Sequence, residues 1–280
     1  MPTLRPSSYG HFLLLIGFWL LILKHAEAQI TPPGLGRARS ASWFAVGIRQ
    51  ELDTAKSWQS MTYFGLGTKS HPERTNPLER HAIFIANQEF YHQVDKFGQY
   101  SFALSYRRQP EFSSQAPFAL EEPPLQHEFR SYIRFVRFFY LSGNRIGLTF
   151  RQDFRRFYGP DLSPFPEDWQ IRSRFRIQST FQLDSRNRKR LILGAEALFP
   201  TSRDRVSKEW SRFQYRESRF SAFFSLSPPK SPFIFNMGYM LNLVGKEMPF
   251  AVHFLAFDLI IENPFQLRKR SKNAIVENLE

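Results

Sequence analysis

Apolar and polar residues alternate along most of the chain with a period of two. In residues 99–109, aromatic and aliphatic side chains at the even positions 100–106 alternate with polar or small side chains at odd positions. The same pattern covers 169–184 and recurs in 145–157 and 233–243. Because successive side chains of a β-strand point to opposite faces, this alternation predicts strands. No stretch carries a sustained amphipathic helical pattern.

Eleven segments carry the alternation with varying clarity. They are 43–52, 57–68, 81–92, 99–109, 128–140, 145–157, 169–184, 190–199, 210–225, 233–243 and 250–261. Strands of soluble proteins are commonly about 5–6 residues long, whereas a tilted transmembrane strand needs about 9–11. The lengths predict an all-β fold, an antiparallel up-and-down transmembrane β-barrel of about 10–12 strands over residues 41–262. Bacterial single-chain barrels have even strand numbers, so ten or twelve strands are expected and one is missed or overcounted.

The predicted connections alternate between short and long. Short turns are expected at 53–56, 93–98, 141–145 and 184–189, and longer loops at 69–80, 110–127, 158–168 and 200–209. Short turns at one end and long loops at the other are typical of an up-and-down barrel. A periplasmic N-terminus would make the first connection long, yet 53–56 is short. Either an extra strand lies near one end, or the long loops face the periplasm.

The first 28 residues have the features of a cleaved signal peptide. Arg5 precedes an apolar run over 12–23, which is too short for a transmembrane helix of about 20 residues. Ala26 and Ala28 then form a small-residue cleavage site. The interpretation is an exported chain with a cleaved segment 1–28, a lead at 29–40 and a polar tail at 263–280. A buried core helix is the alternative for the apolar run.

Four blocks of the strand pattern resemble a known family. They are WFAVGIRQEL at 43–52, WQSMTYFGLG at 58–67, IANQEFYHQ at 85–93 and YSFALSYRRQ at 100–109. Together they resemble an uncharacterised Gram-negative outer-membrane family filed as a domain of unknown function (serial 2490). The resemblance covers roughly 41–262 and implies an outer-membrane β-barrel, with no catalytic residue to carry over. The tail at 263–280 departs from the many outer-membrane barrels that end in an aromatic residue.

Composition and charge narrow the range of partners. The formal net charge is +13, and 31 of the 280 residues are phenylalanine. Arginine and aromatic residues interleave over 129–140, as in proteins that bind single-stranded nucleic acid. An exported protein rarely meets nucleic acid, so lipopolysaccharide phosphates, outer-membrane lipid or anionic solutes are the expected partners. The chain has no cysteine, which excludes disulfides and thiol chemistry.

The polar faces of the predicted strands would line the lumen of the barrel. The predicted lumen residues are Glu89, Arg107, Glu128, Arg130, Arg134, Arg151, Asp153, Arg155, Arg172, Arg174, Arg176 and Glu196. A ladder of arginines can select anions in a pore. Interlocked arginine–carboxylate pairs can equally fill a narrow barrel, and this structural interpretation is preferred.

Two other functions remain open at this point. A periplasmic soluble β-barrel could bind an anionic lipid or solute, with its aromatic faces inward and its arginines outward; period-two alternation cannot distinguish that inversion. An outer-membrane lipid hydrolase would need a serine with a histidine and an orienting acid or amide, and the candidate histidines are His81, His92, His127 and His253. The chain contains no known hydrolase or metal-binding signature, so neither catalytic residues nor a metal or other cofactor are predicted.

Overall fold

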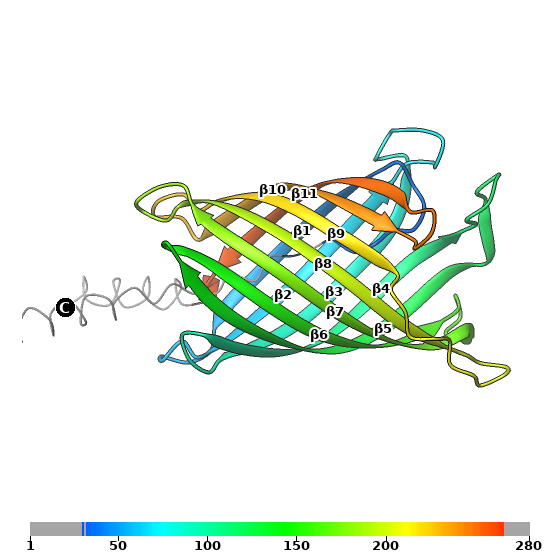
Figure 1. Ribbon diagram of the computed structural model, residues 1–280, viewed down its shortest axis with the longest axis horizontal. Helices are drawn as coiled ribbons and strands as arrows, with labels where there is room; N and C mark the ends of the chain where they lie inside the picture. Colours follow the sequence, from blue (N-terminus) through cyan, green and yellow to red (C-terminus); the bar gives the residue numbers. More distant parts are fainter. Residues whose placement is uncertain (1–29, 31, 266–280) are drawn as a thin grey trace, which may run out of the picture. The chain divides into compact units, whose positions relative to one another are not determined.

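The computed structural model describes residue 30 and residues 32–265, and its architecture is a closed β-barrel of eleven strands (Figure 1). The strands are β1 (Ser40–Glu51), β2 (Trp58–Lys69), β3 (Arg80–Gln93), β4 (Gly98–Phe112), β5 (Leu120–Leu141), β6 (Asn144–Tyr158), β7 (Pro164–Gln182), β8 (Lys189–Asp204), β9 (Glu217–Leu226), β10 (Phe233–Val244) and β11 (Phe250–Glu262). The barrel belongs to the compact unit that begins at Pro32. The predicted signal peptide and most of the predicted tail lie outside the described residues. None of the helices in the described part of the chain has the length and hydropathy of a membrane span.

The prediction of an all-β barrel is confirmed, and every predicted strand corresponds to an observed one. The expectation of an even strand number is wrong, because the barrel closes with eleven. Each strand pairs antiparallel with its neighbour in sequence, but β1 pairs parallel with β11, from Ser40 opposite His253 to Arg49 opposite Glu262. A parallel closing pair permits an odd number of strands.

The parallel closure also explains the order of the connections. With an odd number of strands, β1 begins at one rim of the barrel and β11 ends at the other; we call these the N-terminal rim and the C-terminal rim. The connections at the N-terminal rim are 70–79, 113–119, 159–163, 205–216 and 245–249, and those at the C-terminal rim are 52–57, 94–97, 142–143, 183–188 and 227–232. The chain therefore enters β1 at the rim with the longer loops, and no extra strand is needed.

Some predicted boundaries are wrong because strands extend beyond the alternating region. The sequence predicts a loop over 110–127, but β5 begins at Leu120 and pairs with Phe112 across a bulge in β4. Two adjacent prolines, Pro123 and Pro124, made this stretch resemble a loop. The first residues of β5 extend beyond the rim of the barrel and are mostly exposed on both faces. Because neither face is buried there, the sequence does not alternate between apolar and polar residues. In contrast, β9 begins at Glu217 and not at residue 210.

Short turns at the C-terminal rim are held by aspartate side chains. In the turn between β7 and β8, the Asp184 carboxylate accepts hydrogen bonds from the backbone N–H of Lys189 at 2.9 Å and of Arg188 at 2.7 Å. These bonds favour the charged carboxylate and lower the pKa of Asp184 below its usual value. Asp53 plays the same role between β1 and β2, where Ser57 and the backbone of Trp58 donate to it.

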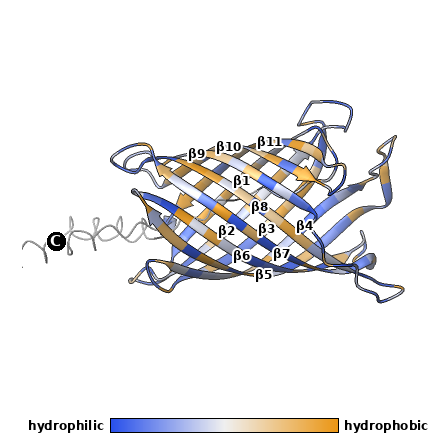
Figure 2. Ribbon diagram, in the orientation of Figure 1, coloured by the Kyte–Doolittle hydropathy of each residue, from blue (hydrophilic) through white to orange (hydrophobic). Residues whose placement is uncertain are grey.

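The outer face of the barrel is apolar. Leu104 exposes 69% of its surface, Phe135 52% and Phe175 51%, and the hydropathy pattern alternates along the strands (Figure 2). Aromatic side chains with polar tips flank this face. Trp58 packs 4.5 Å from His92 near the C-terminal rim, and the Tyr106 hydroxyl lies 2.7 Å from His127 Nδ1 toward the N-terminal rim. This arrangement matches the aromatic girdles that border the apolar band of transmembrane barrels.

One side of the barrel interior is filled with apolar side chains. Trp43, Phe223, Phe254 and Met240 are fully buried on β1, β9, β11 and β10. Gly65 on β2 faces the Trp43 ring so closely that a β-carbon at this position would overlap it. The Trp43 indole N–H donates to the buried carboxylate of Asp258 at 3.1 Å. Most of the buried charged residues lie on the other part of the wall, on β3 to β8.

Candidate functional site in the barrel lumen

The ionisable residues predicted to line the lumen lie on six neighbouring strands, β3 to β8, and are directed inward. Eight have less than a tenth of their surface exposed: Glu89, Arg107, Glu128, Arg130, Asp153, Arg155, Arg174 and Glu196. The other four, Arg134, Arg151, Arg172 and Arg176, are half-buried. Charged groups that leave bulk water need partners, and most of these residues find them in one another.

Glu128 on β5 is the most highly connected carboxylate. It accepts a hydrogen bond from Arg130 Nε at 2.5 Å and two from Arg155, whose Nε and Nη2 lie 3.0 and 2.6 Å from its oxygens. Arg107 Nε on β4 lies 3.9 Å from the same carboxylate. Arg155 also donates to Gln170 on β7. One buried anion therefore links three adjacent strands, β4 to β6, and Arg155 extends the contacts to β7.

Arg130 and Arg174 extend these contacts around the wall. Arg130 reaches Asp153 on β6 at 3.4 Å, and Arg151 Nε lies 2.5 Å from the same carboxylate. Arg174 on β7 lies 3.8 Å from Asp153 and forms two parallel hydrogen bonds with Glu196 on β8, at 3.1 and 2.7 Å. Such two-point pairing fixes the geometry of both side chains. The chain of contacts thus runs continuously from β4 to β8.

A second group surrounds Glu89 on β3. Its carboxylate accepts hydrogen bonds from Ser101 at 2.6 Å, from the Tyr132 hydroxyl at 2.6 Å and from Arg134 at 3.1 Å. The Arg151 guanidinium lies 3.4 Å above the Tyr132 ring. This stacking joins the group around Glu89 to the group around Asp153.

Two ionisable residues on β9 were missed by the sequence analysis. Arg219 lies 3.7 Å from Glu196 and pairs with Glu217, and both β9 residues are buried. The alternation of 217–225 could have revealed them, since Glu217, Arg219 and Phe223 share one face. The predicted strand began at residue 210, where the alternation is absent, so the sequence analysis did not identify which residues of this strand face inward.

We call the set of these side chains the lumen network. Its arginines are Arg107, Arg130, Arg134, Arg151, Arg155, Arg172, Arg174, Arg176 and Arg219, and its carboxylates are Glu89, Glu128, Asp153, Glu196 and Glu217. Nine cations therefore face five anions. Among the described residues, five buried guanidinium nitrogens of the network have no hydrogen-bond partner, on Arg107, Arg130, Arg134, Arg151 and Arg219. The network retains an excess of positive charge and of donors.

Residues 32–35 lie inside the barrel, and residues 36–39 continue along the N-terminal rim into β1, where Arg37 donates to the Ser114 carbonyl. The Pro32 carbonyl accepts a hydrogen bond from Arg219 at 3.3 Å, and the Leu35 carbonyl accepts one from Lys69 Nζ at 2.8 Å. Gly34 lies against Arg219 and Glu217 so closely that a β-carbon would be 2.9 Å from the guanidinium. We call residues 32–39 the lead segment. It occupies lumen space at the N-terminal rim.

The histidines considered for a hydrolase lie away from the lumen network. His127 contacts the Tyr106 hydroxyl, and His253 contacts the Tyr239 hydroxyl at 2.6 Å. His253 is exposed on the outer face of β11, whereas Asp258 is buried on the inner face. The two residues are an odd number of positions apart on one strand, so Asp258 cannot orient His253. His92 packs between Trp58 and Tyr100, and His81 is exposed at the start of β3.

No family model and no curated protein sequence matches the chain. The resemblance in the strand blocks therefore stays a prediction. The function therefore follows from the structure of the barrel, which is closed and has an apolar outer face and a charged inner network.

Proposed function

We propose that the chain is an integral outer-membrane β-barrel whose lumen is held closed by the lumen network and the lead segment. In this role it is a structural membrane protein and not an open channel. The observation that carries the proposal is the division of the wall into an apolar outer face and a charged, interlocked inner face.

The outer face argues for lipid contact. Phenylalanine, leucine and isoleucine side chains on several neighbouring strands expose about half of their surface, which in water would be a very large apolar patch. Closed barrels satisfy all ladder hydrogen bonds within the sheet, as a membrane interior requires. The soluble alternative needs the aromatic side chains inside and the arginines outside, which is opposite to the observed orientation. Export to the outer membrane rests on the features of residues 1–28.

The inner face argues for a closed lumen. Barrels of this size leave little interior space, and here one side is filled by Trp43, Phe223 and Phe254 and the other by the lumen network. The lead segment adds backbone to the same space near the N-terminal rim. A hydrated ion would have to separate arginine–carboxylate pairs in order to pass.

Two measurements test this function. The extracted protein should migrate as two bands in SDS depending on boiling, because a closed transmembrane barrel resists SDS until it is heated. In planar bilayers the wild-type protein should give no steady conductance steps. A single band with recovery in the soluble periplasmic fraction would overturn the membrane assignment. Stable steps in wild type would overturn the closed lumen.

A second function, a narrow anion path, is favoured by the excess of arginine in the lumen network. Rings of cationic side chains select anions in pores. Displacing the lead segment should expose this path, and Gly34→Leu would displace it because the new side chain overlaps Arg219. We expect anion-selective steps from this variant and none from the control Arg39→Gln, which changes an exposed side chain at the end of the lead segment, outside the lumen. A silent Gly34→Leu barrel would refute the path.

A further inference from the structure

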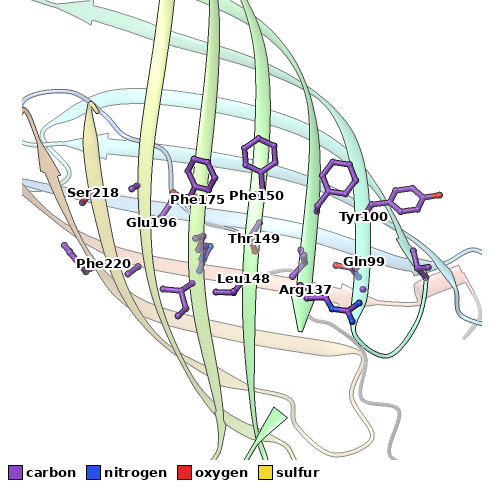
Figure 3. Close-up of a pocket in the computed structure, with 18 of the residues that line it drawn as sticks. Gln99, Tyr100, Arg137, Leu148, Thr149, Phe150, Phe175, Glu196, Ser218 and Phe220 are labelled. Atoms are coloured by element: carbon purple, nitrogen blue, oxygen red, sulfur yellow. The ribbon is translucent and has the colours of Figure 1, made fainter. Parts of the chain in front are cut away.

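An apolar groove of about 970 Å³ crosses the outer wall of the barrel over strands β4 to β9 (Figure 3). One side is formed by an aromatic row, Tyr100, Phe135, Phe150 and Phe175, which continues into Ala197 and Ser218. The other side is a second row, which begins at Arg137 and ends at Phe220. Between them lie Leu148, Ile177 and Ala195, and we call this row the aliphatic row. The backbone of the inward-facing residues between the rows forms the floor.

Strand register explains why the two rows are continuous. Members of the aromatic row are direct partners across each ladder, from Tyr100 opposite Phe135 to Ala197 opposite Ser218. The aliphatic row is paired in the same way, two residues nearer the C-terminal rim on each strand from β5 to β9. Neighbouring strands are about 4.8 Å apart, so five steps give a groove of about 24 Å. With strands tilted by about 45°, it spans about 17 Å of membrane depth, close to one leaflet of about 15 Å.

The sides of the groove differ from the rest of the apolar wall. The Phe150 and Phe175 rings stand side by side, with their centroids 5.2 Å apart and their planes tilted by 42°. On β8 both rows have a small residue, Ala195 and Ala197, and on β9 the first row ends at Ser218 and the second at Phe220. A long, narrow and apolar groove of this kind fits an extended hydrocarbon chain better than it fits a protein helix.

Positive charge lies at the end of the groove that meets the C-terminal rim. The Arg137 side chain is 57% exposed, and its guanidinium lies 5.4 Å from the Phe97 ring. Lys96 Nζ lies 4.8 Å from the same ring. Asp95 is the nearby carboxylate, 3.8 Å from Arg137 Nη1, which is too long for a hydrogen bond. Two cations against one anion leave a net positive site where a lipid headgroup would lie.

We propose that this groove holds one acyl chain of an anionic phospholipid, with its phosphate at Arg137. The inference rests on the proposed membrane function, because only a membrane supplies this ligand. Arg137 has donors to spare for a phosphate oxygen, and guanidinium groups bind phosphate in a two-point geometry. A second copy of the chain is a poorer occupant, since packing a protein surface here would bury Arg137 with only a distant partner.

Native mass spectrometry of the full-length barrel, delipidated in detergent and titrated with phosphatidylglycerol or phosphatidylcholine, tests the proposal. We expect wild type to retain one phosphatidylglycerol with about tenfold preference over phosphatidylcholine, equivalent to about 1.4 kcal/mol. Ala197→Phe should abolish retention by filling the groove, and Arg137→Gln should abolish the preference. The control Ala251→Phe adds the same ring to an exposed position of β11 and should behave as wild type.

Three results would overturn the proposal. The first is that wild type retains phosphatidylglycerol and phosphatidylcholine equally. The second is that Ala197→Phe and Ala251→Phe lose the same amount of phosphatidylglycerol. The third is that wild type forms a dimer and Ala197→Phe dissociates it. The last result would make the groove a self-association surface. Each variant is first checked for the heat-dependent band shift in SDS. A wild-type protein without that shift would refute the membrane function itself, which separates the two failures.

Discussion

Replacing Glu128 by glutamine should destabilise the barrel strongly. The change removes the charge of a fully buried carboxylate that contacts Arg107, Arg130 and Arg155, yet it preserves the shape of the side chain. Removing one partner from a buried ion pair costs about 3–5 kcal/mol. Because the amide oxygen of glutamine still accepts one hydrogen bond, we expect the lower end, about 3 kcal/mol. In an equilibrium melt of a chain of this size, that loss lowers the midpoint by about 6–12 °C, and a rate-based transition should move in the same direction.

The assay is the temperature at which the fast-migrating SDS band converts to the slow one during a fixed incubation. Since barrel unfolding in SDS is irreversible, this temperature reports an unfolding rate and must be compared at one incubation time. The matched control is Glu121→Gln on the same strand, where the side chain is exposed and the transition should not move. The double variant Glu128→Gln/Arg155→Gln should lose less than the sum of the two single variants. A shift below 2 °C for Glu128→Gln would refute the reasoning, because it would mean that water already screens the lumen network.

Three further predictions concern the opposite wall and the turns. Trp43→Phe removes the hydrogen bond to buried Asp258, so stability should fall by about 1–3 kcal/mol, measured by the same band shift. Gly65→Ala should lower the stability by about 1–3 kcal/mol, because the new β-carbon overlaps the Trp43 ring. In the control Gly147→Ala the β-carbon has ordinary contact distances, so the loss of stability should be smaller. Equal effects of the two variants would contradict the packing. The pKa of Asp184 is lowered in the folded protein, so its stabilising contribution is present above the unfolded pKa of about 3.9 and is lost as pH falls through the folded value. Asp184→Ala should therefore lower the transition at pH 7 and flatten its decline as pH falls below about 5, and an unchanged acid profile would contradict this role.

The candidate site illustrates what alternation can identify. The inward positions of β3 to β8 were named from sequence because polar residues occupy every second place in long strands. Arg219 and Glu217 were missed because β9 is the shortest strand and its boundary was placed seven residues early. The partners within the lumen network could not be named, since they depend on how far each strand is shifted against the next.

The sequence by itself determined the all-β class, the approximate position of each strand and which residues share a face. These properties are local, because a strand places successive side chains on opposite sides. Only the tertiary structure decided that the arginine faces point inward, because alternation is identical for a barrel and for its inversion. It also decided the parallel closure of β1 on β11, which joins residues more than 200 positions apart. Pairing at that distance depends on strand tilt and register around the whole wall, and no local pattern records either.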